Sequence, residues 1–270
     1  MTRNLGIDSQ TLFGMPPVEH VVLAADLECT HVSFGFHALP WKLDGFPAWS
    51  LRENPALRRE LRAAMSDRGV SIALAEGFIV RPGSEIRDRT GDMDLFAELG
   101  AANASTVSMD PDYPRALDQL AALAEMAAER GMGVVLEFAP PHPINSLAGA
   151  LRAIEQIAMP NAGVVIDAMH FFRSGGTVDD LAAVDPALLR YAQLCDAPLN
   201  VSNDDYLNEA CFNRMSPGTG DLPLRSLIDA LPDNIPFGLE APMLAAVKDS
   251  PGVRQVVEEL VRRSRALLDA

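Results

Sequence analysis

Residues 133–138, GVVLEF, and residues 163–171, GVVIDAMHF, decide how this chain is read. Each is a short run of Val, Ile and Leu that begins after a glycine and ends at a carboxylate, Glu137 or Asp167. Continuous apolar runs of this length are typical of buried parallel strands. Residues 147–158, between them, carry apolar side chains at helical spacing. The segment is therefore interpreted as two parallel strands joined by a helix.

The same alternation extends in both directions along the chain. In residues 114–131 the apolar side chains recur at helical spacing, with Pro114 at the start and Gly131 at the end. Eight apolar runs are predicted as strands: 5–9, 31–36, 71–78, 105–110, 133–138, 163–171, 191–197 and 236–241. Eight amphipathic stretches are predicted as helices: 17–29, 55–66, 92–99, 114–131, 147–158, 178–190, 222–231 and 253–268.

Strands that alternate with helices in a chain of 270 residues predict an α/β fold, a single (β/α)8 TIM barrel. A doubly wound open sheet is the alternative. We expect one domain over residues 1–270, because no linker or shift in composition marks a boundary.

Composition limits the classes of partner. With 37 acidic and 22 basic residues, the formal charge is −15. Nucleic acids and anionic membranes both bind clustered Lys and Arg, so neither is expected as a partner. Three scattered cysteines favour a reducing compartment, and we see no signal peptide or membrane-spanning run. We expect a cytoplasmic protein with a small-molecule substrate, and a homodimer is left open.

The C-terminal ends of the strands carry the chemistry in such barrels. A single carboxylate there is more often a helix cap or a salt-bridge partner. Several at one barrel mouth would repel each other, and a divalent cation relieves that repulsion. We predict one divalent ion, Mn²⁺ or Mg²⁺, because oxygen ligands suit these hard cations. Glu137, Asp167 and Glu240 close their runs, and Gln193 sits inside the run YAQLCD; these four residues are the predicted ligands.

Other polar residues are candidates for substrate contacts. His170, where a strand turns into a loop, can face the same cavity. His37 and Glu76 follow earlier strands and either line the pocket or have structural roles. The segment NRMSPGTGDLPL, residues 213–224, contains a rigid Pro-Gly turn, and Arg214 just before it is a candidate clamp for an anion or a hydroxyl.

The order and spacing of these pieces resemble the sugar phosphate isomerase/epimerase group of the xylose-isomerase-like TIM barrel superfamily. The resemblance covers essentially the whole chain, although its motifs all lie within residues 133–241. No single motif is distinctive, and their order carries the resemblance. The motifs are VVLEF (134–138), VIDAMH (165–170), QLCD (193–196), NRMSPGTGD (213–221) and FGLE (237–240).

The resemblance implies roles for individual residues. Glu137 and Glu240 match the two glutamates that hold the metal and shuttle the proton in ketose 3-epimerases of this group. Asp167 matches the aspartate ligand, and His170 matches a histidine near the substrate. Arg214 matches an arginine that contacts the substrate.

The seventh strand departs from the family pattern. The family usually supplies a histidine ligand three residues before the acidic residue, and here Gln193 precedes Asp196, a further candidate substrate contact. An amide oxygen binds hard cations but is a weaker donor than imidazole for Zn²⁺ or Co²⁺. The multi-zinc DNA-repair nucleases of the superfamily need several more histidines, so that branch is not expected.

These residues predict a metal-dependent isomerase or epimerase of a small hydroxy-carbonyl, sugar-like substrate. Glu137 and Glu240 are the predicted acid and base, acting through a metal-stabilised enediolate. One alternative is a lyase or dehydratase on a similar substrate. The other, suggested by Gln193, is a barrel with a degenerate metal site and a binding or accessory role.

The loop at 37–54 contains Trp41, Phe46 and Trp49. It is interpreted either as a lid over the pocket or as a loop packed on a neighbouring helix or subunit.

Overall fold

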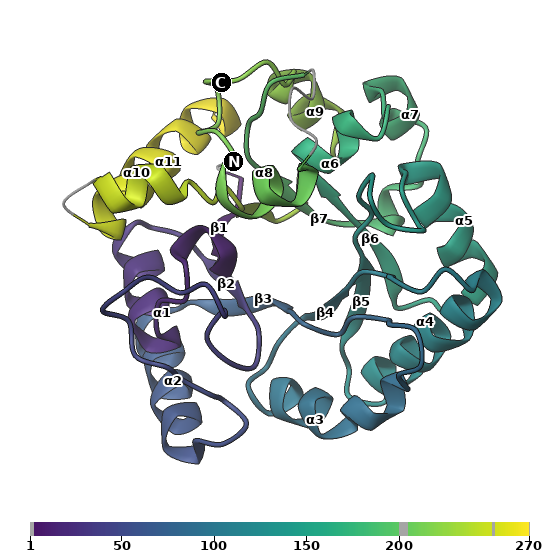
Figure 1. The fold of residues 1–270 in the computed structure, drawn as a ribbon, viewed down its shortest axis with the longest axis horizontal. Helices are drawn as coiled ribbons and strands as arrows, with labels where there is room; N and C mark the ends of the chain where they lie inside the picture. Colours follow the sequence, from purple (N-terminus) through teal and green to yellow (C-terminus); the bar gives the residue numbers. More distant parts are fainter. Residues whose placement is uncertain (1–2, 200–204, 250–251, 270) are drawn as a thin grey trace.

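Eight parallel strands close into a barrel in which β1 pairs with β8, and helices surround it (Figure 1). The computed structural model describes residues 3–199, 205–249 and 252–269. The strands are β1 (Leu5–Asp8), β2 (His31–Phe34), β3 (Ser71–Ala75), β4 (Asn103–Thr106), β5 (Gly133–Leu136), β6 (Ala162–Asp167), β7 (Leu189–Leu194) and β8 (Phe237–Leu239). The predicted (β/α)8 fold is confirmed, and the open sheet is excluded by the β1–β8 pairing.

Helices follow the strands around the barrel. The α-helices are α1 (Pro17–Asp26), α2 (Pro55–Arg68), α3 (Thr90–Glu98), α4 (Tyr113–Ala128), α5 (Leu147–Ile157), α6 (Ala168–Arg173), α7 (Val178–Ala182), α8 (Tyr206–Phe212), α9 (Leu224–Ala230), α10 (Leu244–Asp249) and α11 (Val253–Leu268). Three short 3-10 helices are η1 (Ser9–Leu12), η2 (Ile86–Arg89) and η3 (Pro186–Leu188).

Local sequence explains where the long helices begin. The Asp112 side chain accepts a hydrogen bond from the backbone N–H of Arg115, which caps α4, and Ser146 caps α5 in the same way. Strands β5 and β6 are buried along their whole length, as the Val-rich runs predicted. Barrel strands and the inner faces of the helices form the core between them.

Two predicted elements are corrected by the structure. Strand β6 ends at Asp167, and His170 lies in helix α6 rather than on a strand end. The helix predicted over 178–190 is interrupted: α7 ends at Ala182, η3 spans Pro186–Leu188, and β7 begins at Leu189. Proline has no backbone N–H and a constrained backbone, so it begins a new short turn instead of continuing a helix.

Of the helices in the described ranges, none is long and apolar enough to span a membrane.

Candidate active site

A cavity of about 660 Å³ opens at the mouth of the barrel, at the C-terminal ends of the strands. Its wall includes six of the residues selected from the sequence: His37, Glu76, Glu137, His170, Arg214 and Glu240. Asp167, Gln193 and Asp196 are buried and are not part of this wall. The fold therefore brings most of the selected residues to one cavity.

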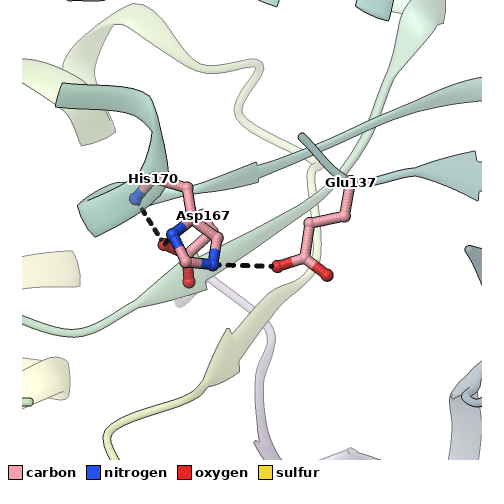
Figure 2. Close-up of side chains that lie close together, drawn as sticks. All are labelled: Glu137, Asp167 and His170. Carbon is pink, nitrogen blue, oxygen red and sulfur yellow. Dashed lines mark hydrogen bonds and ion pairs between the residues drawn. The ribbon is translucent and has the colours of Figure 1, made fainter. Parts of the chain in front are cut away.

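Three potential metal ligands meet beside the cavity. One ligand atom each from Glu137, Asp167 and His170 lies within 4.8 Å of the others. Figure 2 shows the imidazole of His170 between the two carboxylates, with its Nε2 atom 3.5 Å from Glu137 Oε1. The other ring nitrogen, Nδ1, is hydrogen-bonded to the hydroxyl of Tyr206 at 2.6 Å. His170 was expected to contact substrate, and the structure places it in the ligand cluster.

Asp167 joins the end of β6 to the start of α6. Its Oδ1 atom accepts a hydrogen bond from the backbone N–H of His170 at 2.8 Å, so the carboxylate is the N-cap of α6. This cap turns the chain through one helical turn, which brings the imidazole back beside the carboxylate that positions it. The Asp-x-x-His spacing thus has a local structural cause.

Arg214 connects Asp167 to Glu240. It is buried, and its Nη1 atom donates to Asp167 Oδ2 while its Nη2 atom lies 3.1 Å from Glu240 Oε2. The Nε atom donates to the carbonyl of Ala210 at 2.8 Å, which orients the guanidinium. Glu240 is therefore tied to the metal-ligand cluster through an arginine rather than by direct contact.

A polar layer lies on β1, β7 and β8. The carboxylate of Asp8 accepts hydrogen bonds from Tyr191 Oη at 2.8 Å and Gln193 Nε2 at 3.0 Å. The other amide atom, Gln193 Oε1, is buried and has no hydrogen-bond donor in the described part of the chain. Gly238 leaves room for this layer, because a Cβ atom there would lie 2.3 Å from Tyr191 Oη and 2.4 Å from Asp8 Oδ2.

Burial raises the pKa of several carboxyl groups in the site. The pKa of Glu137 rises to about 8, mainly from burial and then from the charge of Asp167. Burial and then the charge of Asp8 raise the pKa of Glu76 to about 7. Burial also raises the pKa of Glu240 well above its ordinary value, and Arg214 offsets only part of that effect. These raised values show a surplus of negative charge in a poorly solvated place.

The ionisation of the ligand cluster differs from residue to residue. Burial would raise the pKa of Asp167, but the charge of Arg214 and the hydrogen bonds from Arg214 and from the backbone N–H of His170 lower it overall. Burial lowers the pKa of His170 to about 4. At neutral pH the cluster therefore holds an ionised Asp167 and a neutral imidazole, the form in which histidine binds metals.

A family model described as "Xylose isomerase-like TIM barrel" matches residues 21–262. The chain belongs to this family. Curated relatives are two proteins named inosose isomerase. One, from Halalkalibacterium halodurans, is 28% identical over 117 residues, which is 42% of this chain and 39% of the relative. The other, from Bacillus subtilis, is 25% identical over 120 residues, 43% of this chain and 41% of the relative. These alignments thus span about two fifths of the relatives' length.

Solved structures show the same xylose isomerase-like fold. A structure of the IolI protein with a bound zinc atom has a TM-score of 0.79 at 16% identity, covering 98% of both chains. The apo form of 3-keto-D-glucoside 4-epimerase from E. coli has a TM-score of 0.71 at 17% identity, covering 98% of this chain and 99% of that one. The curated relatives are named as isomerases, and this structural neighbour is named as an epimerase.

The donor set of this family member fits a divalent metal ion. Glu137, Asp167 and His170 already converge. Gln193 pairs in register with Asp167 on the neighbouring strand, and its amide oxygen lacks a donor within the described residues. Four further carboxylates share the site region with Asp167, and the charge of Arg214 offsets part of their repulsion: Asp8, Glu76, Glu137 and Glu240. A divalent cation would neutralise part of that excess.

The remaining sequence-selected residues have other surroundings. Glu76 lines the cavity and accepts hydrogen bonds from Ser33 and, at 3.0 Å, from Ser9. His37 is exposed at the rim. The carboxylate of Asp196 accepts from the backbone N–H groups of Ala197, Gly218 and Leu222, so it holds the turn that contains residues 216–222. Asp196 is not part of the cavity wall, and its substrate contact stays a prediction.

The loop after β2 reaches across the mouth. Trp41 packs edge-on against Phe212 of α8, with 5.5 Å between the ring centroids, while the indole N–H of Trp49 donates to the Gly14 carbonyl at 3.1 Å. Residues 37–54 were interpreted either as a lid or as a loop packed on a neighbouring helix or subunit. The structure shows packing on a helix of the same barrel. Trp41 also lines the cavity, so the loop covers part of its opening.

Sequence reasoning missed several residues of the site. Tyr206, which contacts His170, lies in a helix that was not predicted. Tyr191 precedes Gln193 by two residues on β7, and strand periodicity would have placed both side chains on one face. The cavity wall also contains the arginines at positions 52, 81 and 89, which are spread along the sequence and carried no motif.

Proposed function

We propose that the chain is a metal-dependent isomerase or epimerase of a small hydroxy-carbonyl compound. One observation carries the proposal: Glu137 and Glu240 line one cavity, where His170 contacts the first and Arg214 contacts the second. Two carboxyl groups on one cavity are the groups needed to remove a proton from a carbon and to return it. Membership of a family with named isomerases supports the same class.

The metal would be held by Glu137, Asp167 and His170, together with the amide oxygen of Gln193 and the carboxylate of Glu240. We propose Mn²⁺ or Mg²⁺, because most of these donors are oxygen atoms. A divalent ion bound there supplies stabilisation of the negative charge that develops on a substrate oxygen as the neighbouring C–H bond ionises.

The side chains themselves handle the proton. In one direction Glu240 removes the proton from the carbon next to the carbonyl, and Glu137 delivers one from the other side. Arg214 Nη2, 3.1 Å from Glu240 Oε2, holds that carboxylate in position. The Tyr206 hydroxyl orients the ring of His170 by the bond to Nδ1, which leaves Nε2 directed at Glu137. The covering loop reduces the access of water to the site.

Metal analysis and isotope exchange test this function. Protein purified without chelator should contain about one divalent ion per chain. Turnover of inosose or a 3-keto-D-glucoside, the substrate types named for relatives, should place deuterium from D₂O at the carbon next to the carbonyl, measured by mass spectrometry. Absence of both metal and Mn²⁺-induced thermal stabilisation would leave a degenerate site. Turnover that retains the original hydrogen would indicate a hydride shift, and loss of water would indicate a lyase.

Replacing Gln193 by His tests its proposed role as a ligand. Imidazole is a better donor than an amide oxygen for Co²⁺ and Zn²⁺. Gln193→His should therefore strengthen binding of these two ions more than binding of Mg²⁺, as measured by titration calorimetry. An unchanged order of dissociation constants would show that residue 193 does not bind the metal.

A further inference from the structure

The cavity has a second, basic end, which no part of the proposed proton transfer uses. Three arginines line it: Arg52 in the turn before α2, Arg81 between β3 and η2, and Arg89 at the end of η2. They lie on segments that follow β2 and β3, whereas the metal-ligand cluster is on β5 and on β6 with α6. The metal-ligand cluster thus lies on one side of the cavity, and the three arginines lie on the other, where Glu76 and Glu85 also line the wall.

Two of these guanidinium groups are held in place by packing. Arg52 and Arg89 each stack on the ring of Phe36, with 4.5 Å and 4.9 Å from Cζ to the ring centroid. Both also pair with Asp92, Arg52 through Nε at 2.6 Å and Arg89 through Nε at 2.5 Å. One carboxylate therefore serves two arginines and leaves a net positive charge on a rigid support.

Donor groups remain unused at this end. Within the described ranges, the Nη1 atoms of Arg52 and Arg89 make no hydrogen bond to the protein, and Arg81 makes no ion pair; its recorded contact is with the sulfur of Met109 at 3.5 Å. Glu85 also lines the cavity, but Gln119 and Arg115 already bond to its carboxylate, at 2.9 Å and 3.2 Å.

We infer that this basic end binds an oxyanion carried by the substrate, either a carboxylate or a phosphate, while the hydroxy-carbonyl end lies at the metal-ligand cluster. The inference rests on the proposed function and adds a substrate class to it. Planar guanidinium groups match both oxyanions and form strong charge-assisted hydrogen bonds in a partly desolvated cavity. A neutral sugar would leave the unused Arg52, Arg81 and Arg89 donors to water.

Three six-carbon ketoses with different charges test the inference: neutral D-fructose, 5-keto-D-gluconate with a carboxylate, and D-fructose 6-phosphate. Titration calorimetry on the intact chain loaded with Mn²⁺ should show at least one anion binding about tenfold or more tightly than D-fructose. The preferred anion identifies the group. Added NaCl should weaken that preference, because screening acts on the charged ligand alone.

Arg81→Gln should remove most of the preference, because it weakens binding of the anion much more than binding of D-fructose. This variant breaks no ion pair in the described structure, so its fold should be preserved. Arg62→Gln is the matched control, since Arg62 lies on α2, is 57% exposed and, within the described part of the chain, pairs only with Glu98, at 3.5 Å. All three ligands should bind this control as they bind the original chain.

Any of three results would overturn the inference. D-Fructose could bind as tightly as both anions or more tightly, neither anion could bind measurably, or Arg81→Gln could keep the preference for the anion. Binding is measured without turnover, so the outcome is separate from the test of the proposed function. If the chain prefers anions but exchanges no proton, the oxyanion site is supported and the isomerase function is not. If the chain exchanges the proton but does not prefer anions, the isomerase function is supported and the oxyanion site is not.

Discussion

Glu240→Gln is expected to lower the rate of deuterium incorporation from D₂O about 10²- to 10⁴-fold, because an amide cannot accept the proton that the carboxylate removes. The metal content should change little, since Glu137, Asp167 and His170 remain and the new amide still offers an oxygen. Isotope incorporation by mass spectrometry and metal analysis of the same sample measure the two effects separately. Glu98→Gln on the exposed surface of α3 should behave like the original chain.

Glu137→Gln completes the acid/base test. If the two glutamates act on opposite sides of the carbon, neither variant should form deuterium-labelled product. One of the two variants should still incorporate deuterium into the substrate that is recovered unreacted. Full exchange in Glu240→Gln with metal retained would show that Glu240 is not the base. Loss of exchange together with loss of metal would show that Glu240 is an essential metal ligand and would not support its additional role in proton transfer.

Arg214→Met is expected to destabilise the metal-free protein by about 3–5 kcal/mol, the usual cost of removing one partner of a buried ion pair. The change leaves Asp167 and Glu240 without the guanidinium that contacts both. Chemical denaturation in the presence of EDTA measures this cost. Adding Mn²⁺ should reduce the difference from the original chain, since the cation neutralises the same carboxylates.

Arg173→Met is the matched control for that rescue. Arg173 is as buried as Arg214, with side-chain exposures of 2% each, and it pairs with Glu209 at 3.0 Å. Its loss should also destabilise the chain, but Mn²⁺ should not restore more stability than it gives the original protein. Equal rescue of the two variants would mean that the metal does not bind beside Arg214.

Much of the barrel could be predicted because strands that are buried on both faces have continuous apolar runs in their sequence. The runs at 133–138 and 163–171 are Val-rich since both faces of β5 and β6 are covered. The same apolar character hid helix α6, because Met169 and Phe171 are buried and continue the apolar run after Asp167. Periodicity alone cannot separate a buried strand from one buried helical turn.

The side of the cavity that holds the metal-ligand cluster could be predicted from strand ends, but the contacts between its side chains could not. A carboxylate after a strand could be placed at the mouth for Glu137 and Glu240. That Arg214 would bridge Asp167 and Glu240 depends on how the loop before α9 folds back, which no local pattern encodes. The basic end could not be predicted for the same reason, because its three arginines are far apart in the sequence and only the fold brings them to one cavity.

The two ends of the cavity are formed by different kinds of secondary structure. Glu137 and Asp167 are at the ends of ladder-bonded strands, whereas Arg81 and Arg52 belong to connecting segments. Such segments accept insertions and substitutions that a barrel strand does not. Selection acting on residues 52–89 can therefore change which molecule is admitted without rebuilding the residues proposed to move its proton. A scaffold arranged in this way can diverge by replacement of loops while the side chains at the strand ends are kept.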